Sequence, residues 1–297
     1  MTEQITKQNI EMENLIKLLD DEDEYVYENV KSKFIEFGNE AKNFLIEYTF
    51  SDNKVISERA EEIINYLNFK NIEDKFLNIL DKKDILEDAV FLIAEYEYPE
   101  MNSENYKMIL DKMAIDIEGM IFKRYQNYPS VNDKLNALNY YLFVEKGYTG
   151  NEKDFYSPDN SYINKVMDKK TGIPISLSIL YMLLAKRIGI QIHGINLPSH
   201  YIVKFKNEQE EIFIDPFNKG ALISKEDAVL FLKRIGIDEE NLDNVPFLKP
   251  ADDFTTIKRL LGNLINIYNK LEDKRRTDEL SKLILLFGGF EQEEEEL

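Results

Sequence analysis

The sequence contains no cysteine, no tryptophan and only two histidines among its 297 residues. The absence of cysteine excludes disulfides, thiolate metal sites and catalysis by a cysteine nucleophile. Two histidines are too few for a histidine-rich metal site, and we expect neither a metal nor any other cofactor. A chain without cysteine also fits a reducing compartment, so we expect a cytoplasmic protein.

Long apolar runs are also missing. No stretch approaches the roughly 18 apolar residues that span a bilayer, and residues 1–4 (MTEQ) do not start a signal peptide. The chain carries 56 acidic and 37 basic residues, with a formal net charge of −19. Binding to the phosphate groups of nucleic acid or of a membrane surface requires clustered Lys and Arg side chains. We therefore expect that the chain binds neither nucleic acid nor a membrane.

Helical patterning dominates both ends of the chain. Val26, Val30, Phe34 and Phe37 recur at helical spacing, and Gly38 follows as a predicted C-cap. This order of Leu-Leu-Asp-Asp, helix, glycine and helix resembles a HEAT-like repeat. Such helices form protein-contact surfaces in many proteins, and the alternative is that they pack against their own neighbouring domain.

These patterns predict a mostly helical α+β fold in four regions. We expect a HEAT-like helical region over residues 1–80 and a core with leading helices over 81–225. A C-terminal helical region follows over 226–290, because apolar residues recur at helical spacing from 257 to 271 and again toward 287. Residues 291–297 form an acidic tail that we expect to be disordered, with docking to a basic partner as the alternative.

The stretch from residue 174 to 187 is predicted to be a buried central helix. Pro174 occupies the first helical position, where proline is tolerated, and Gly189 ends the helix. Between them the sequence is apolar on nearly every side, which is typical of a buried helix. Its polar interruptions, Ser176 and Ser178, lie in the first turns, where free N–H groups favour a developing oxyanion. This arrangement suits a serine nucleophile and equally suits a plain helix cap.

Two β-rich segments follow the helix, at 200–206 and 211–215, and they flank the polar turn 207–210. A hairpin centred between residues 207 and 208 places His200 directly opposite Asp215, with Cβ atoms on the order of 5 Å apart. A carboxylate beside a histidine fixes its orientation, as the third member of a catalytic triad does. The alternative is a structural hydrogen bond. His193 has no carboxylate at matching spacing and is expected to be a structural strand residue.

Five motifs in this order carry a family resemblance: GYTGN at 147–151, NSY at 160–162, GIPISLS at 172–178, PSH at 198–200 and DPFNKG at 215–220. Over about residues 85–285 the chain resembles the SirB-type transglutaminase-like family. The resemblance implies a papain-like core with a central helix packed on a small antiparallel sheet, followed by tetratricopeptide-like helices. The HEAT-like N-terminal region lies outside that core.

The resemblance also implies where a triad would lie. In the wider superfamily a cysteine starts the central helix, and a histidine and an aspartate on strands complete the triad. His200 and Asp215 match the last two positions. The first position falls near Pro174, and the nearest hydroxyl is that of Ser176. SirB-type relatives typically lack the cysteine too. They usually have glycine where this chain has Ser199, so a backbone turn with positive φ would be strained there.

Three hypotheses about function follow. The first is a noncatalytic interaction or regulatory module, whose protein partner binds the helical arms. The second is a hydrolase or acyltransferase that uses Ser176, His200 and Asp215 as a triad. The third is a ligand or peptide cleft that reuses the His200–Asp215 pair for binding. The oligomeric state, the substrate and the identity of the partner are not determined by the sequence.

Overall fold

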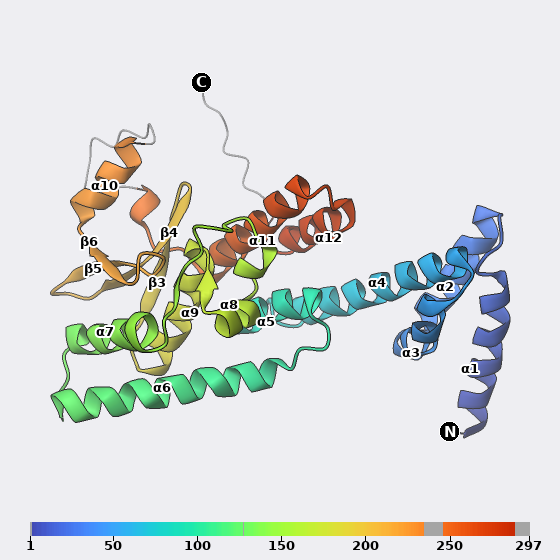
Figure 1. Ribbon diagram of the computed structural model, residues 1–297, viewed down its shortest axis with the longest axis horizontal. Helices are drawn as coiled ribbons and strands as arrows, with labels where there is room; N and C mark the ends of the chain where they lie inside the picture. Colours follow the sequence, from blue (N-terminus) through green and yellow to red (C-terminus); the bar gives the residue numbers. More distant parts are fainter. Residues whose placement is uncertain (1, 127, 235–245, 289–297) are drawn as a thin grey trace. The chain divides into compact units, whose positions relative to one another are not determined.

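The computed structural model describes residues 2–126, 128–234 and 246–288 (Figure 1), and the tail predicted over 291–297 lies outside them. The chain folds into two compact units, residues 1–75 and 76–297. In the part of the chain that the structure describes, no helix combines the length and the apolar character required to cross a bilayer.

Unit 1 is helical throughout its described residues. Its elements are α1 (Thr2–Leu15), a 3-10 turn (Ile16–Leu18), α2 (Glu24–Phe37), α3 (Asn39–Leu45), a second 3-10 turn (Ile46–Phe50) and most of α4 (Lys54–Leu77). Gly38 ends α2 with a φ of 59° and also precedes α3, which confirms the predicted C-cap. The HEAT-like description of this region stays a prediction.

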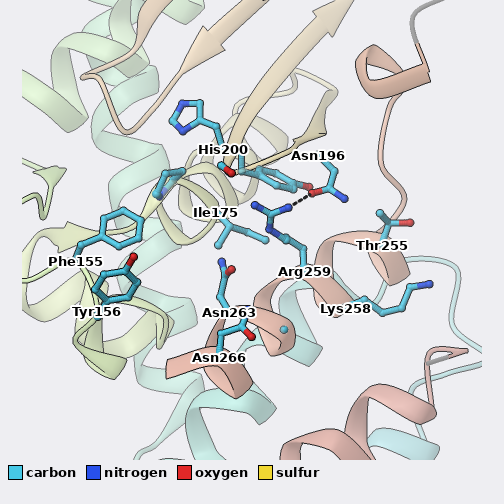
Figure 2. A pocket seen from close by; sticks show the side chains of 14 residues that line it. Phe155, Tyr156, Ile175, Asn196, His200, Thr255, Lys258, Arg259, Asn263 and Asn266 are labelled. Carbon is cyan, nitrogen blue, oxygen red and sulfur yellow. Dashed lines mark hydrogen bonds between the residues drawn. The ribbon is translucent and has the colours of Figure 1, made fainter. Parts of the chain in front are cut away.

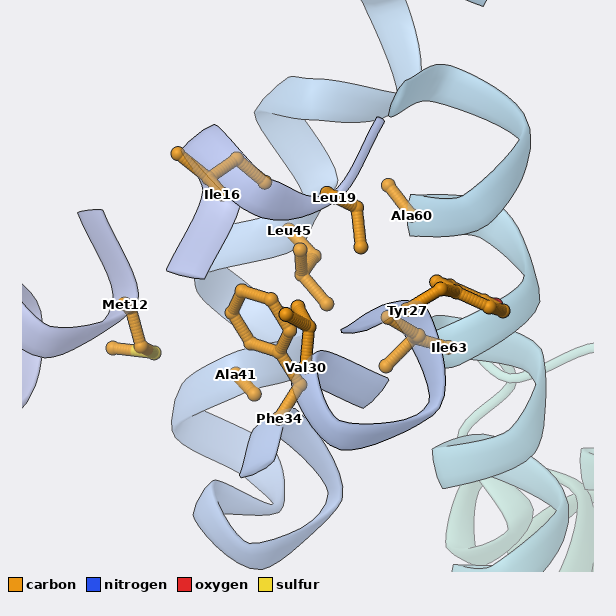
Figure 3. Packing of buried hydrophobic residues seen from close by; sticks show 10 residues of the cluster. All are labelled: Met12, Ile16, Leu19, Tyr27, Val30, Phe34, Ala41, Leu45, Ala60 and Ile63. Atoms are coloured by element: carbon orange, nitrogen blue, oxygen red, sulfur yellow. The ribbon is translucent and has the colours of Figure 1, made fainter. Parts of the chain in front are cut away.

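The core of unit 1 collects apolar side chains from each of its helices (Figure 3). Phe34 and Leu45 are fully buried at its centre, and Leu19 and Ile63 close it from the flanking elements. Phe34 belongs to the predicted apolar series on α2, which therefore faces the core as a helical period of 3.6 residues requires. Unit 1 thus has a hydrophobic core of its own.

Unit 2 contains the remaining helices. Before the central helix these are α5 (Leu86–Glu97), α6 (Ser103–Tyr125), α7 (Val131–Asn139) with a π-helical continuation (Tyr140–Glu145), a 3-10 turn (Pro158–Asn160) and α8 (Ile163–Lys169). The central helix is α9 (Pro174–Arg187). After the strands come α10 (Lys225–Arg234), a 3-10 turn (Pro246–Leu248), α11 (Asp253–Lys270) and α12 (Lys274–Leu285).

Two small sheets belong to unit 2. Strands β1 (Thr149–Gly150) and β2 (Thr171–Gly172) form a short parallel pair. The second sheet is antiparallel, with the order β3 (Ile192–Leu197), β4 (His200–Lys206), β5 (Glu211–Asp215) and β6 (Ala221–Ile223). The predicted strands at 200–206 and 211–215 are confirmed with the same bounds.

Helix α9 is the centre of unit 2. Its residues from Pro174 to Ala185 are all buried, because strands β3 and β4 cover it on one side and helices α6, α7, α8 and α11 contact it elsewhere (Figure 1). Gly189 has a φ of 72° and follows the helix as predicted. A central helix on a small antiparallel sheet, surrounded by further helices, confirms the mostly helical α+β fold expected from the sequence.

Candidate functional site

Ser176, the candidate nucleophile, lies in the first turn of α9, and its hydroxyl points into the protein interior. Ser176 is 1% exposed, and its Oγ donates to the backbone carbonyl oxygen of Asn160 at 2.5 Å. The same Oγ accepts a hydrogen bond from the backbone N–H of Ile173 at 3.1 Å. A Cβ atom at Gly172 would lie only 2.7 Å from it. Ser176 therefore ties the start of the helix to the preceding loop.

The structure brings His200 and Asp215 together. The Nε2 atom of His200 lies 2.8 Å from Oδ2 of Asp215, and the side chain of the aspartate is 5% exposed. Within the part of the chain that is described, this carboxylate is the one hydrogen-bond partner of the His200 ring. The ring also packs against Phe217 and Phe231, with centroids 6.2 and 6.1 Å away. The second imidazole nitrogen, Nδ1, makes no hydrogen bond to a described residue.

The hairpin register that suggested this pairing is wrong by two residues. The sequence argument pairs Val203 with Ile212, whereas the structure pairs Val203 with Ile214. The hairpin is centred between residues 208 and 209, one position later than assumed, and the Asn207 side chain closes the turn by accepting hydrogen bonds from the backbone N–H groups of Gln209 and Glu210. A shift of two residues keeps every side chain on the same face of the sheet. His200 and Asp215 consequently meet as diagonal neighbours instead of directly opposite ones.

Asp215 also organises the turn that follows β5. Its Oδ1 accepts from the backbone N–H groups of Phe217 and Asn218, and its Oδ2 accepts from the Asn218 side chain at 2.7 Å. Burial alone raises the pKa of Asp215, but the hydrogen bonds from His200 and Asn218 outweigh it and leave the pKa below its ordinary value. Asn218 was not among the predicted site residues, although its place in the DPFNKG motif, an Asx-turn pattern, could have identified it.

Ser199, directly before the histidine, adopts a φ of 60°. It follows Pro198 in the two-residue connection between β3 and β4, where Leu197 pairs with His200. Positive φ is unfavourable for a residue with a Cβ atom. The strain expected at this position from the sequence is therefore present, and it lies next to the imidazole.

A cavity of about 880 Å³ opens at the start of α9 (Figure 2). Its lining comes from a loop before α8, from α9, from the β3–β4 hairpin and from one face of α11. The lining residues are Phe155 and Tyr156; Pro174 and Ile175; Asn196, Ser199, His200 and Tyr201; and Thr255, Lys258, Arg259, Gly262, Asn263 and Asn266.

Pro174 and Ile175 are the residues of α9 that line this cavity beside His200, whereas Ser176 does not line it. The structure thus brings two of the three sequence-predicted site residues together and separates the third from them. No hydrogen bond joins Ser176 to His200 within the described residues. An oriented imidazole with no hydroxyl or thiol from α9 beside it can bind and can move a proton, yet the start of α9 presents no nucleophile to the cavity.

The face of α11 that lines the cavity was not anticipated as part of a site. Arg259 donates from Nη1 to Oδ1 of Asn196 at 3.0 Å, and Asn263 and Asn266 follow at helical spacing (Figure 2). The segment KRLLGNL at residues 258–264 contains Arg259 and Asn263, and their spacing of four residues puts them on one helical face. Their place in the same cavity lining as His200 depends on the tertiary packing of α11, which the sequence pattern does not specify.

His193 lies on β3, away from the His200–Asp215 pair, and lines a second cavity of about 890 Å³. It makes no hydrogen bond to a described residue, and its role as a structural strand residue stays a prediction. Among the residues that the structure describes, no group of three or more His, Cys, Asp or Glu side chains is arranged to hold a metal ion.

Comparisons with known proteins find relatives that cover much of the chain. A UPF0162 protein of Xylella fastidiosa strain Temecula1 is 29% identical over 205 residues, which cover 68% of each chain. A UPF0162 protein of strain 9a5c is 30% identical over 185 residues, or 61% of this chain and 63% of that protein. The F-box only protein 21 of Mus musculus is 30% identical over 142 residues, which cover 45% of this chain but only 21% of that protein.

No solved structure matches the chain. The family model described as the transglutaminase-like superfamily matches residues 104–262, which is more than half of the chain and includes α9, the β3–β4–β5 hairpins and the first half of α11. The chain belongs to the transglutaminase-like superfamily.

Proposed function

We propose that this chain is a noncatalytic member of its superfamily and works as an interaction or regulatory module. One observation carries the proposal. The helix positions that line the cavity beside His200 are Pro174 and Ile175, neither of which has a nucleophilic atom, and the nearby hydroxyl of Ser176 is bonded to backbone groups.

The chemistry of serine strengthens the argument. A serine hydroxyl becomes a nucleophile only when a base within about 3 Å removes its proton during attack. The proton of Ser176 is directed to the Asn160 carbonyl oxygen at 2.5 Å instead. For acyl transfer, the side chain would have to leave this bond and also give up the 3.1 Å hydrogen bond from the Ile173 N–H, which would keep a longer one, of 3.4 Å, to the Asn160 carbonyl oxygen. Such a rearrangement weakens the link between the preceding loop and the helix that would have to support catalysis.

The competing hypothesis of a Ser176–His200–Asp215 hydrolase makes a sharp prediction. A fluorophosphonate probe would then label the full chain at Ser176, and the label would be lost in His200→Ala. We expect no labelling of the wild type over pH 6–9, measured by intact-mass spectrometry against a known serine hydrolase as positive control. Labelling at Ser176 that depends on His200 would overturn the noncatalytic proposal.

The finer family features belong to this proposal. The five ordered motifs support SirB-type membership, with tetratricopeptide-like helices over the C-terminal region and HEAT-like helices over residues 1–80. The absence of cysteine supports a cytoplasmic location. The excess of acidic side chains supports binding to protein and argues against nucleic acid or a membrane.

The protein partner would bind the helical arms. Unit 1 exposes large aromatic side chains, with Tyr25 76% and Phe50 85% exposed, and such side chains are common anchors at protein interfaces. The test uses the full chain with Tyr25→Ser and Phe50→Ser, and Tyr128→Ser on unit 2, where Tyr128 is 95% exposed, as the matched control. If a co-purifying protein is lost with the first two variants but retained with the third, the result supports binding of the partner to the helical arms. Equal recovery of the co-purifying proteins with all three variants contradicts binding to the helical arms.

A further inference from the structure

The cavity at the start of α9 differs in charge from the rest of the molecule. Its 14 lining residues include two permanently cationic side chains, Lys258 and Arg259, and no aspartate or glutamate. The whole chain, in contrast, has 56 acidic against 37 basic residues. A cation-lined hollow in a strongly acidic protein concentrates positive potential where an anion would enter.

Arg259 lacks the counter-ion that other partly buried arginines of unit 2 have. Arg187 makes ion pairs with Glu87 and Asp111 at 2.7 Å each. Arg259 is partly buried too, but its hydrogen bond goes to the neutral amide oxygen of Asn196, and no described carboxylate pairs with it. Burial accordingly lowers the pKa of its guanidinium from the ordinary value. Desolvating a cation without a counter-ion is costly, so a structural role alone does not explain this position.

The neighbours of Arg259 offer further contacts to a bound group. In Figure 2 its guanidinium lies among the side chains of Asn196, Asn263 and Ile175. A guanidinium has five N–H donors, and the hydrogen bond to Asn196 uses one of them. Phe155 and Tyr156 form an aromatic part of the lining, which suits an apolar portion of the same ligand.

We propose that this cavity binds a ligand through a carboxylate group, for which Arg259 supplies the paired donors and the neighbouring asparagines supply neutral hydrogen bonds. A planar guanidinium matches the two oxygens of a carboxylate. In Figure 2 the Lys258 side chain extends away from the Arg259 guanidinium, so the amides surround one positive charge, which fits a single negative charge better than a phosphate dianion. The volume of about 880 Å³ admits a short peptide segment or a small organic acid. The proposal is independent of any partner of unit 1 and of whether the site performs chemistry.

Two variants of the full chain test whether Arg259 pairs with a carboxylate of the ligand. Arg259→Met removes the cation but keeps much of the side-chain volume. Asn196→Asp keeps Arg259 and replaces its amide partner, 3.0 Å away, by a nearly isosteric carboxylate that supplies the counter-ion internally. We expect either change to weaken carboxylate binding. Arg124→Met, at an exposed arginine on α6 outside the cavity, is the control for the same loss of net charge.

The probes are three carboxylates and two controls, titrated by NMR at about pH 7 and low salt. Acetyl-Ala-Phe offers a peptide C-terminus, acetyl-Ala-Glu-amide an acidic side chain and 3-phenylpropanoate a free acid. Acetyl-Ala-Phe-amide is the neutral control and phenyl phosphate the phosphate control. We expect at least one carboxylate to bind at least about tenfold more tightly than the neutral amide, with that advantage lost in Arg259→Met and Asn196→Asp but kept in Arg124→Met.

The ranking of the three carboxylates then identifies the source of the group. Equal binding of acetyl-Ala-Phe and its amide, binding of phenyl phosphate alone, or no binding of any probe would overturn the proposal. Unchanged carboxylate affinity in Asn196→Asp would overturn the proposal as well, because the new carboxylate would pair with Arg259 in place of the ligand's carboxylate. Urea unfolding of each variant confirms that it is folded.

Discussion

Two arginines of the C-terminal helices have opposite surroundings. Arg276 on α12 donates from Nε and Nη2 to both oxygens of Glu97, at 2.7 and 2.9 Å, and pairs with Asp273 through Nη1 at 2.6 Å. Arg259 on α11 faces the cavity and bonds only the amide oxygen of Asn196 among the described side chains. The first arginine has its charge neutralised within the chain, and the second does not.

The same difference separates Ser176 from His200. The buried hydroxyl of Ser176 both donates and accepts within the first turn of α9 and its preceding loop, whereas His200 lines the cavity and its Nδ1 makes no hydrogen bond to a described residue. Groups whose hydrogen bonding is completed inside the chain support the fold. Groups that keep unused donors or acceptors toward a cavity are the ones available to a ligand.

The greatest change in unfolding free energy is expected on replacing Arg276, in contrast to Arg259. Arg276→Met leaves the carboxylates of Glu97 and Asp273 without their cation, and we expect it to lower the free energy of unfolding by about 2–3 kcal/mol. Arg259→Met removes a desolvated cation that has no counter-ion, so we expect a change of about 1 kcal/mol or less. Urea unfolding of both variants measures the difference, and equal losses would break the comparison.

Next in size is the loss of the Ser176 hydroxyl. Ser176→Ala removes the hydroxyl between the Asn160 carbonyl and the Ile173 N–H and leaves these buried groups with a longer bond of 3.4 Å to each other, which we expect to cost about 1–3 kcal/mol. Ser178→Ala is the matched control on the same helix, because the Ser178 Oγ makes only a long bond of 3.3 Å to the Tyr201 carbonyl. We expect the control to lose less than about 1 kcal/mol. A harmless Ser176→Ala change would show that this hydroxyl does not support the helix start.

A smaller effect depends on pH. The pKa of Asp215 is lower in the folded chain than in the unfolded one, so its carboxylate stabilises the fold above the unfolded pKa of about 4 and ceases to do so as the pH falls through the folded pKa. Asp215→Asn should therefore cost about 1 kcal/mol near pH 5 and less toward pH 2. The measurement is the difference in unfolding free energy between wild type and variant across that range. If the difference in unfolding free energy instead grew as the pH fell, the carboxylate of Asp215 would not stabilise the fold in the way proposed.

The smallest effect concerns the strained residue before His200. Ser199→Gly relieves the cost of a positive φ, and we expect the unfolding free energy to rise by about 0.5–1 kcal/mol. Ser199→Ala removes the hydroxyl but keeps the Cβ atom, so it should give no gain. A stabilisation by alanine equal to that by glycine would assign the effect to the hydroxyl instead of the backbone.

The sequence predicts most of the local structure of unit 2. The bounds of α9 follow from Pro174, a continuous apolar stretch and Gly189, all of which act within one helix. The strands β4 and β5 follow from β-rich runs around a polar turn. The pairing register does not, because it depends on how the Asn207 side chain closes the turn, a detail of hydrogen bonding that composition leaves open.

The candidate site is only partly contained in the sequence pattern. The contact between His200 and Asp215 was predicted, and it forms despite the incorrect register because a shift of two residues preserves the face. The direction of the Ser176 side chain could not be predicted, since serine in a first turn serves as a cap or as a nucleophile with the same local sequence. The contribution of α11 arises from packing between segments about 60 residues apart, as in the Arg259–Asn196 bond.

The cavity keeps an oriented imidazole but lacks a nucleophile at the start of α9. Pro174→Cys tests it most directly, because the chain has no other cysteine and any alkylation reports on this position alone. With His200 beside it, the new thiol should have a lowered pKa and react with iodoacetamide at pH 6 about tenfold faster than in the Pro174→Cys/His200→Ala double variant. Equal rates in the two proteins would contradict the account.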